Sequence, residues 1–486
     1  MQQAALQCMP VSYRRHEPEK EVLYQVVAEH LETFLERLRS EGHELPGHVV
    51  QEFYRYLECG ILAHGFARCA CETCGKSFSV GFSCKGRGFC PSCIGRRMAD
   101  TAAHLVDNVI PRVPIRQWVL SLPIEIRYRL AYDKKLLSEV LAVFLRVIGG
   151  WYKKTASSLG FQKAQWGSVS FLQRFGSSLA VNPHIHALGL DGVYGHPIEL
   201  PSSLEFLPTP GPTDEEVRRI VETVAFRVIR LLKKRGVLDA NDFDPFQEAS
   251  PALSAMTAAS VQGLVATGER SGMRVRRVLS DPDQGVRTSK LCYASRGFSL
   301  HAATRVEAHN RDRLEQLCRY VTRPPLSSER LERLSEDKLL LRLKTPWADG
   351  TSFLILSPFE ILEKLAAIVP LPRANMIRYG GIFAPHAKDR AKVVPRSGKA
   401  ETENPEAADA GENPPSKGGR MEWARLLKRV FNVDVTVCPD CGGHMRILAF
   451  LTEPDSIRRY LDGIGLPSEP PSIAPARSPP QADFGF

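Results

Sequence analysis

The chain has 486 residues, which is long for one domain and predicts roughly three domains. Its composition, with 43% hydrophobic and 24% charged residues, is that of a globular protein. The sequence has no apolar run long enough for a transmembrane helix and no apolar segment of a secretory signal after Met1, so we expect a cytoplasmic protein without a membrane partner. Lysine and arginine (64) exceed aspartate and glutamate (54), and the net charge of +10 suits a polyanionic partner without requiring one.

Regular elements can be predicted along most of the chain. An extended segment is predicted for residues 115–123, and two antiparallel strands are predicted after Trp166, the second over residues 183–190. Hydrophobic periodicity predicts helices over residues 20–39, 49–57, 213–235 and 310–321. The third of these helices begins with a capping box, Thr213 and Glu216, and Gly236 follows its end.

The cysteines are clustered, which in a reducing compartment is typical of metal sites. Six of the twelve lie between Cys69 and Cys93. The spacing C-x2-C-x15-C-x2-C is that of a zinc ribbon, in which two turns present four thiolates to one ion; it is formed by Cys71, Cys74, Cys90 and Cys93. Four sulfur ligands leave no open position, so the sequence predicts a structural Zn²⁺ site. Cys84, which lies between the two pairs, is an alternative fourth ligand.

A second cysteine pair lies near the C-terminus. Cys438 and Cys441 are separated by two residues, and His444 follows them. These three residues are a candidate second metal site, although a single C-x2-C pair also occurs without a metal.

Basic residues are concentrated around the first cysteines and are opposed there only by Glu72. They are Arg68, Lys76, Lys85, Arg87, Arg96 and Arg97. Basic groups pair with phosphates and exposed aromatic rings stack on bases, so a nucleic-acid surface is one interpretation. Phe78, Phe82 and Phe89 lie between these basic residues, and the other interpretation is that they form the small core of the ribbon.

Two histidines lie on the second predicted strand. Alternation puts His184 and His186 on one face and Ile185 on the other, and two imidazoles on one face can bind one divalent ion. The preceding strand returns Gln173 toward them, as a candidate third ligand with an oxygen atom. Asp191 is a weaker candidate because it follows the strand. Two unrelated surface histidines remain the alternative interpretation.

A tyrosine near the end of the last predicted helix is flanked by arginines. Tyr320 could act as a nucleophile toward phosphorus, while Arg319 and Arg323 offset phosphate charge. Without that context, Tyr320 is an ordinary residue of an amphipathic helix.

These motifs together resemble a known family. A domain with two C-x2-C pairs that contains SCKGRGFCPSC, followed by HIH and then RYVTRPP, resembles the HUH-nuclease transposases of rolling-circle insertion sequences. These are the IS-ninety-one-like elements and their common-region relatives. The resemblance extends over nearly the whole chain, including QRFGSSLAVNPHIHALGLDGVY and WARLLKRVFNVDVTVCPDCGG.

The resemblance implies an activity and its residues. His184 and His186 would hold catalytic Mg²⁺ or Mn²⁺ against the scissile phosphate of DNA, at single-stranded or hairpin element ends. Tyr320 would attack that phosphate, leaving a 5′-phosphotyrosine and a free 3′-hydroxyl. Lys85, Arg87, Arg96, Arg97, Arg319 and Arg323 would contact DNA. No small-molecule cofactor beyond metals is implied, and the bacterial nucleoid is the expected location.

The sequence departs from part of the family at one position. Two-tyrosine members carry a second tyrosine four residues before the first, where this chain has Gln316. It therefore resembles the single-tyrosine subtype. Three alternatives stay open: a replication initiator with the same chemistry, a non-catalytic zinc-ribbon DNA-binding protein, and a phosphodiesterase that uses water instead of Tyr320.

The expected fold is α+β, with an HUH endonuclease core around a central antiparallel sheet, an N-terminal zinc-ribbon domain and a small C-terminal module. The predicted boundaries are residues 1–105 for the helical, zinc-binding and DNA-contacting domain and 106–387 for the nuclease domain, with a helical insertion at about 204–260. Residues 388–420 are poor in large apolar residues and are predicted as a flexible linker. Residues 421–466 form the small C-x2-C module, and the proline-rich residues 467–486 a disordered tail.

Overall fold

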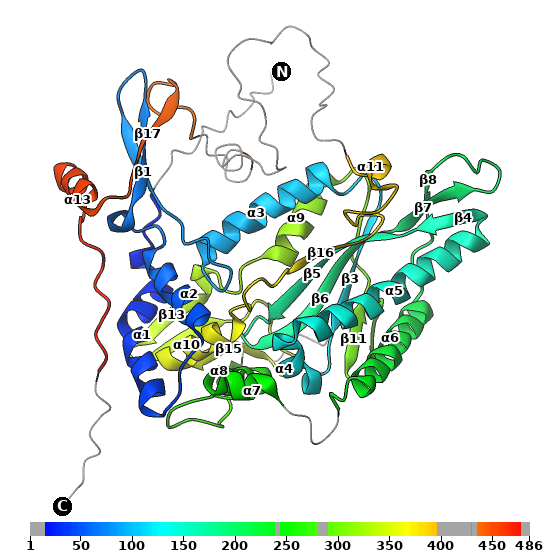
Figure 1. Ribbon diagram of the computed structural model, residues 1–486, viewed down its shortest axis with the longest axis horizontal. Helices are drawn as coiled ribbons and strands as arrows, with labels where there is room; N and C mark the ends of the chain where they lie inside the picture. Colours follow the sequence, from blue (N-terminus) through cyan, green and yellow to red (C-terminus); the bar gives the residue numbers. More distant parts are fainter. Residues whose placement is uncertain (1–14, 239–243, 280–289, 396–428, 430–434, 478–486) are drawn as a thin grey trace, which may run out of the picture.

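Figure 1 shows the computed structural model, which describes residues 15–238, 244–279, 290–395, 429 and 435–477. The predicted helices and strands are confirmed, with ends that shift by a few residues: α1 (Val22–Ser40), α2 (Gly47–Glu58), β3 (Ile115–Ser121), β5 (Gly167–Phe175), β6 (Val181–Leu190), α6 (Asp214–Lys234) and α9 (Arg311–Thr322). The capping box of α6 is present, because the Thr213 hydroxyl accepts from the Glu216 N–H and the Glu216 carboxylate accepts from the Thr213 N–H.

The centre of the fold is a seven-stranded sheet in which all strand pairs are antiparallel, as predicted. Its strand order is β10-β11-β3-β6-β5-β16, with β12 also paired to β3. The strands not yet given are β10 (Cys292–Ser295), β11 (Phe298–His301), β12 (Arg305–Val306) and β16 (Ile377–Gly381). The strand with the two histidines, β6, lies in the interior of this sheet between β3 and β5.

Helices cover both faces of the central sheet (Figure 1). On one face lie α4 (Ile124–Tyr132), α5 (Lys134–Ser158) and α6; on the other lies α9, with α3 (Pro91–Asn108) packed against it. One continuous hydrophobic core joins these helices to the sheet, with Trp118, Phe144 and Ile185 fully buried in it. The histidine strand is therefore packed between apolar side chains of the core.

A second core lies beside the sheet. It joins α1, α2, α8 (Pro251–Gln262) and α10 (Pro358–Ile368) to a four-stranded sheet of order β13-β14-β15-β9. These strands are β13 (Leu331–Ser335), β14 (Lys338–Arg342), β15 (Thr351–Leu356) and β9 (Arg276–Leu279). A further three-stranded sheet, β4-β7-β8, consists of β4 (Phe161–Gln165), β7 (Gly192–Pro197) and β8 (Glu205–Pro208). Between α6 and α8 lies the short helix α7 (Pro245–Ala249).

Segments from the two ends of the chain form one small sheet, of order β17-β1-β2 (Figure 1). It contains β1 (Phe66–Cys71), β2 (Ser77–Gly81) and β17 (Met445–Leu451), and α13 (Pro454–Gly463) follows β17. The antiparallel register pairs Phe66 with Leu451 and Cys71 with Met445. The C-terminal module is therefore built onto the N-terminal domain and is not a separate body.

Two predicted boundaries need correction. The predicted linker begins too early, because α11 (Arg390–Val393) is helical and Val393 is buried in the main core; residues 396–420 of that linker lie outside the described residues. The predicted tail is in part attached, because the backbone N–H of Ala474 donates to Ala28 O at 2.9 Å and that of Arg477 donates to Thr33 Oγ1 at 3.0 Å. Both acceptors belong to α1, so packing extends further along the chain than composition indicated.

Among the described residues, no helix has the length and apolar character needed to cross a membrane.

Candidate active site and metal centres

His184 and His186 on β6 lie on the same face of the central sheet as Gln173 on β5. The register pairs Gln173 on β5 and Ser121 on β3 directly with His184, and paired residues of an antiparallel sheet lie on the same face. The rings of His184 and His186 are 4.9 Å apart between centroids. Ile185 points to the opposite face and is fully buried, as its alternation predicts.

The hydrogen bonds of the histidines leave nitrogen atoms free on the same face. His184 Nδ1 lies 2.7 Å from Asn182 O, so this nitrogen carries the proton and Nε2 keeps its lone pair. His186 Nδ1 lies 2.9 Å from Gln117 Nε2; with the amide turned so that its oxygen faces Nδ1, this histidine nitrogen carries the proton and His186 Nε2 becomes an acceptor. His186 Nε2 and Gln173 Oε1 are buried without a hydrogen-bond partner among the described residues. Two buried acceptors with no partner fit a bound cation.

Burial also keeps the two imidazoles neutral. It lowers the pKa of His184 to about 4 and that of His186 to about 2, and the neighbouring His184 lowers the pKa of His186 further. Both rings are therefore uncharged at neutral pH, which is the protonation state in which imidazole binds a metal.

Tyr320 lies beside this pair. It is on the last turn of α9, and its ring centroid is 6.2 Å from that of His186 with the two planes perpendicular. Two cations flank the ring: Arg323 Cζ lies 4.4 Å and Lys344 Nζ 4.0 Å from its centroid. Tyr320 is 41% exposed, so a bound molecule can reach it. The structure thus brings together the tyrosine and the histidines that the sequence separates by more than a hundred residues.

The two arginines next to Tyr320 differ in their surroundings. Arg323 covers the tyrosine ring and donates to Tyr320 O at 2.9 Å. Arg319 instead pairs with Glu315, which also accepts from Arg429 at 2.6 Å. Because Glu315 already neutralises Arg319, Arg323 is the better placed of the two for a phosphate at the tyrosine.

Asp191, the weaker candidate for a metal ligand, is committed to other partners. Its carboxylate accepts from Arg116 at 2.8 and 2.9 Å, from Tyr152 Oη at 2.8 Å and from Arg305 at 2.7 Å. The carboxylate is fully buried in this network, which ties β3 to the end of β6. No lone pair faces the histidines, so Asp191 is structural.

A cavity of about 740 Å³ opens beside the site. Gln173 and Arg323 line it on the side of the histidines and the tyrosine, and the loop and helix that follow Cys84 line it on the other side. Its basic lining residues are Lys85, Arg87, Arg96, Arg97, Arg174, Arg323 and His104. Asp100 is the one acidic residue among the described residues of the lining. Five of the six predicted DNA-contacting residues, all except Arg319, therefore line one basic cavity that reaches the candidate active site.

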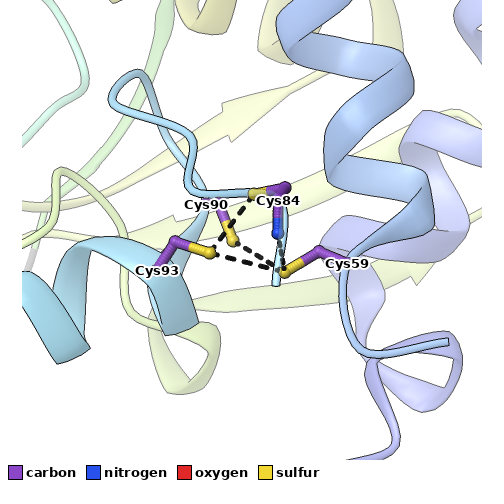
Figure 2. Close-up of side chains that lie close together, drawn as sticks. All are labelled: Cys59, Cys84, Cys90 and Cys93. Carbon is purple, nitrogen blue, oxygen red and sulfur yellow. Dashed lines mark hydrogen bonds between the residues drawn. The ribbon is translucent and has the colours of Figure 1, made fainter. Parts of the chain in front are cut away.

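The cysteines form two groups, not one. In the first group, Cys59, Cys84, Cys90 and Cys93 bring their sulfur atoms within 4.8 Å of one another (Figure 2). The Sγ–Sγ distances include 3.5 Å for Cys59–Cys93 and 3.3 Å for Cys84–Cys93. Hydrogen bonds from the neighbouring thiols hold the pKa of Cys93 well below its usual range, whereas hydrogen bonds to neighbouring cysteines raise the pKa of Cys84 and Cys90. Four closely spaced sulfurs suit a tetrahedral, structural Zn²⁺.

The predicted single ribbon is therefore wrong in its grouping. Cys90 and Cys93 lie with Cys84, the alternative fourth ligand of the prediction, and with Cys59, which follows α2. Cys71 and Cys74 lie instead with Cys438 and Cys441. The physical reason is that β1 and the turn after it carry the first cysteine pair away from the start of α3, where Cys90 caps the helix and Cys93 lies in its first turn. His444, predicted beside Cys438, belongs to neither group.

The phenylalanines near the cysteines pack inside the protein. Phe89 is fully buried against Phe53, with ring centroids 4.9 Å apart, and against Tyr56. Phe78 is partly buried against Cys71 and Cys438. The ring centroid of Phe82 lies 6.4 Å from that of Phe450. The core interpretation holds for Phe89, which is not available for base stacking.

Comparison with known families agrees with this layout. Residues 26–122 match a family model described as "Transposase zinc-binding domain" of the IS91 type, and residues 167–391 match one described as "Putative transposase". No curated protein and no solved structure gives a significant match. A zinc-bearing N-terminal domain joined to a transposase domain defines the class of protein as a zinc-binding transposase. The chain belongs to the IS91-like family of transposases with an N-terminal zinc domain, as the sequence motifs predicted.

Two residues of the site were missed from the sequence. Gln117, which contacts His186, lies in a strand pattern of alternating residues that gives it no distinction. Lys344 reaches Tyr320 from beyond the strand β14, in a segment without a motif. Neither has a signal in a single sequence, because only the tertiary fold brings them to the site.

Proposed function

We propose that this transposase cuts and rejoins single-stranded DNA at the ends of a rolling-circle insertion sequence, with Tyr320 as its single nucleophile. The observation that carries the proposal is the position of Tyr320 beside His184 and His186, with Arg323 and Lys344 against its ring. A nucleophile, a pair of neutral imidazoles and two cations at one point suit transfer of a phosphoryl group. The basic cavity supplies a path for the strand, and the nucleoid is the location that follows.

Three atoms of the site, which receive no hydrogen bond from the described residues, are the candidate ligands of a divalent metal. His184 Nε2, His186 Nε2 and Gln173 Oε1 would hold Mg²⁺ or Mn²⁺, an ion that, when bound, polarises a phosphoryl oxygen. The Tyr320 oxygen forms a bond to phosphorus as the bond to the 3′-oxygen breaks. The phenol loses its proton and the leaving 3′-oxygen gains one. Arg323 and Lys344 offset the negative charge that collects on the phosphate, and the 5′-phosphotyrosine stores the bond for rejoining.

The first test is a covalent-adduct assay. Labelled single-stranded DNA from the element's end is mixed with the protein and Mn²⁺, and products are separated on a denaturing gel. We expect an adduct with the wild-type protein, none with Tyr320→Phe, and none with the double variant His184→Ala/His186→Ala. Tyr379→Phe is the matched control, because Tyr379 lines the basic cavity, whereas Tyr320 lies beside the histidine pair; Tyr379→Phe should form the adduct.

Each of the other outcomes of the adduct assay would support a different mechanism or class of protein. An adduct that persists in Tyr320→Phe would assign another tyrosine. Cleavage without an adduct would favour water as nucleophile, and tight DNA binding without cleavage would favour a binding protein. A replication initiator shares the chemistry, but the match of residues 167–391 to a transposase family favours transposition.

Gln117 should control metal affinity through His186. When His186 binds a metal through Nε2, its Nδ1 carries a proton. The side-chain oxygen of Gln117 can accept a hydrogen bond from this N–H once the Gln117 amide is rotated by 180°. We expect Gln117→Leu to weaken Mn²⁺ binding by about 10- to 100-fold, with single-stranded DNA affinity unchanged. Excess Mn²⁺ should restore adduct formation. Gln117→Glu keeps an acceptor and should bind Mn²⁺ at least as well, whereas equal Mn²⁺ titrations for all three proteins would remove Gln117 from the site.

A further inference from the structure

The two cysteine pairs of the second group lie in turns with the same hydrogen bonds. In Cys71–Cys74 the N–H of Gly75 donates to the carbonyl of the first cysteine at 3.1 Å, and in Cys438–Cys441 the N–H of Gly442 does so at 3.0 Å. In both turns the N–H of the first cysteine donates, at 2.8 Å, to the carbonyl five residues further on. Both glycines have φ of +72°, a conformation that favours glycine. Two unrelated segments thus adopt one metal-knuckle geometry.

Strand pairing brings the two turns face to face. β1 and β17 run antiparallel up to the pair Cys71 and Met445, and the N–H of Glu72 donates to His444 O at 3.0 Å. The contact is close enough that a Cβ on Gly443 would lie 2.4 Å from Thr73 Oγ1. The turns therefore dock with no room for a side chain between them.

The four sulfur atoms meet at one point between the turns. Cys71 Sγ lies 3.5 Å from Cys441 Sγ, and Cys74 Sγ lies 3.6 Å from Cys438 Sγ, with all four within 4.8 Å of one another. A tetrahedral ion with Zn–S bonds of about 2.3 Å separates its sulfurs by about 3.8 Å. We propose that these four thiolates bind a second structural Zn²⁺, contributed half by each end of the chain, and that this ion fastens the C-terminal module to the N-terminal domain.

Apart from the pairing of β17 with β1 and the hydrogen bonds of Ala474 and Arg477 to α1, the module has few contacts with the N-terminal domain. Its core against the N-terminal domain consists of Leu62, Phe66, Ile457 and Leu461. Its ion pairs are Lys76 with Asp440, Arg446 with Glu72, and Arg429 with Asp107 and Glu315. The first two pairs are exposed, and exposed pairs contribute little. A module of this size commonly depends on a metal. The metal therefore decides whether the module stays attached.

The proposal can be tested by cleaving the chain between the C-terminal module and the transposase domain. A specific protease site is inserted within residues 396–428 of the full-length protein, and after cleavage the two fragments are followed by size-exclusion chromatography. With the four cysteines intact, the fragments should co-elute. With Cys438→Ser/Cys441→Ser, they should separate. Co-elution of the double variant, or separation of the unsubstituted protein loaded with zinc, would overturn the proposal.

Metal content provides the independent readout on uncut protein. We expect two zinc ions per chain in the wild type and one in Cys438→Ser/Cys441→Ser, with the circular-dichroism spectrum of the main body preserved. His444→Ala and Cys292→Ser, an exposed cysteine outside both groups, are matched controls that should keep two. Two zinc ions in the double variant, or one in His444→Ala, would contradict a four-cysteine site. These measurements need no DNA cleavage, so they stand apart from the test of Tyr320.

Discussion

Cys90→Ser is expected to remove one zinc ion per chain and to leave the start of α3 disordered. Cys90 precedes the first turn of α3, and its thiol belongs to the buried group with Cys59, Cys84 and Cys93. Structural zinc supplies about 10–16 kcal/mol of apparent binding free energy, which is as large as the stability of a whole domain. A serine oxygen cannot replace the thiolate in a site that the other three sulfurs define.

The loss should reach the candidate active site. α3 packs along α9, which carries Tyr320, so a disordered α3 leaves one face of the tyrosine helix without support. We expect Cys90→Ser to show a lower melting temperature and to lose adduct formation. Zinc content, thermal unfolding and the adduct assay on the same preparation check these three effects.

Cys69→Ala is the matched control for Cys90→Ser. Cys69 is equally buried and near the second cysteine group, but burial raises its pKa, and it is a ligand in neither group. The zinc content of the Cys69→Ala variant should equal that of the wild-type protein. Unchanged zinc content in Cys90→Ser would instead remove Cys90 from the site. If a single ribbon held the only ion, Cys90→Ser would contain no zinc at all.

Local sequence patterns were sufficient for the elements and for part of the site. Periodicity located α1, the capping box located the start of α6, and alternation located the face of β6 that carries the histidines. These features depend on neighbours within a few residues, and so a single sequence contains them.

The grouping of the cysteines could not be predicted in the same way. A spacing of C-x2-C pairs identifies the knuckle turns, but which turns share an ion depends on strand pairing over hundreds of residues. Cys59 stands outside any C-x2-C pair, and Cys438 lies 364 residues from Cys74. For Cys71 and Cys74, sequence spacing favours the nearest C-x2-C pair as the partner in a metal site. The pairing of β1 with β17 instead brings the distant pair of Cys438 and Cys441 to them. Gln117 and Lys344 were missed for the same reason, because their contacts are tertiary.

Asp191→Ala should cost about 3–5 kcal/mol of unfolding free energy, because it leaves a buried charge without its partner. Arg116 is 5% exposed, and without the carboxylate its guanidinium loses its charged partner and keeps the hydrogen bond to Ala302 O, at 2.9 Å. Denaturant unfolding measures the effect. Tyr152→Phe, which removes one hydrogen bond to the same carboxylate but keeps the ion pair, should cost less, about 1.5–3 kcal/mol. Glu215→Ala, which breaks exposed pairs on α6, should change stability little.

The same variant separates a structural role from metal binding. If Asp191 held the catalytic metal, Asp191→Ala would weaken Mn²⁺ binding and leave stability nearly unchanged. The hydrogen bonds of its carboxylate predict the reverse, with a large loss of stability and a Mn²⁺ affinity that follows the folded fraction. Replacing both charges, in Arg116→Leu/Asp191→Leu, should restore much of the lost stability, because a buried pair costs most when only one partner is removed. Recovery in the double variant would show that Asp191 serves Arg116 and the joint between β3 and β6, and that the metal belongs to the histidine face.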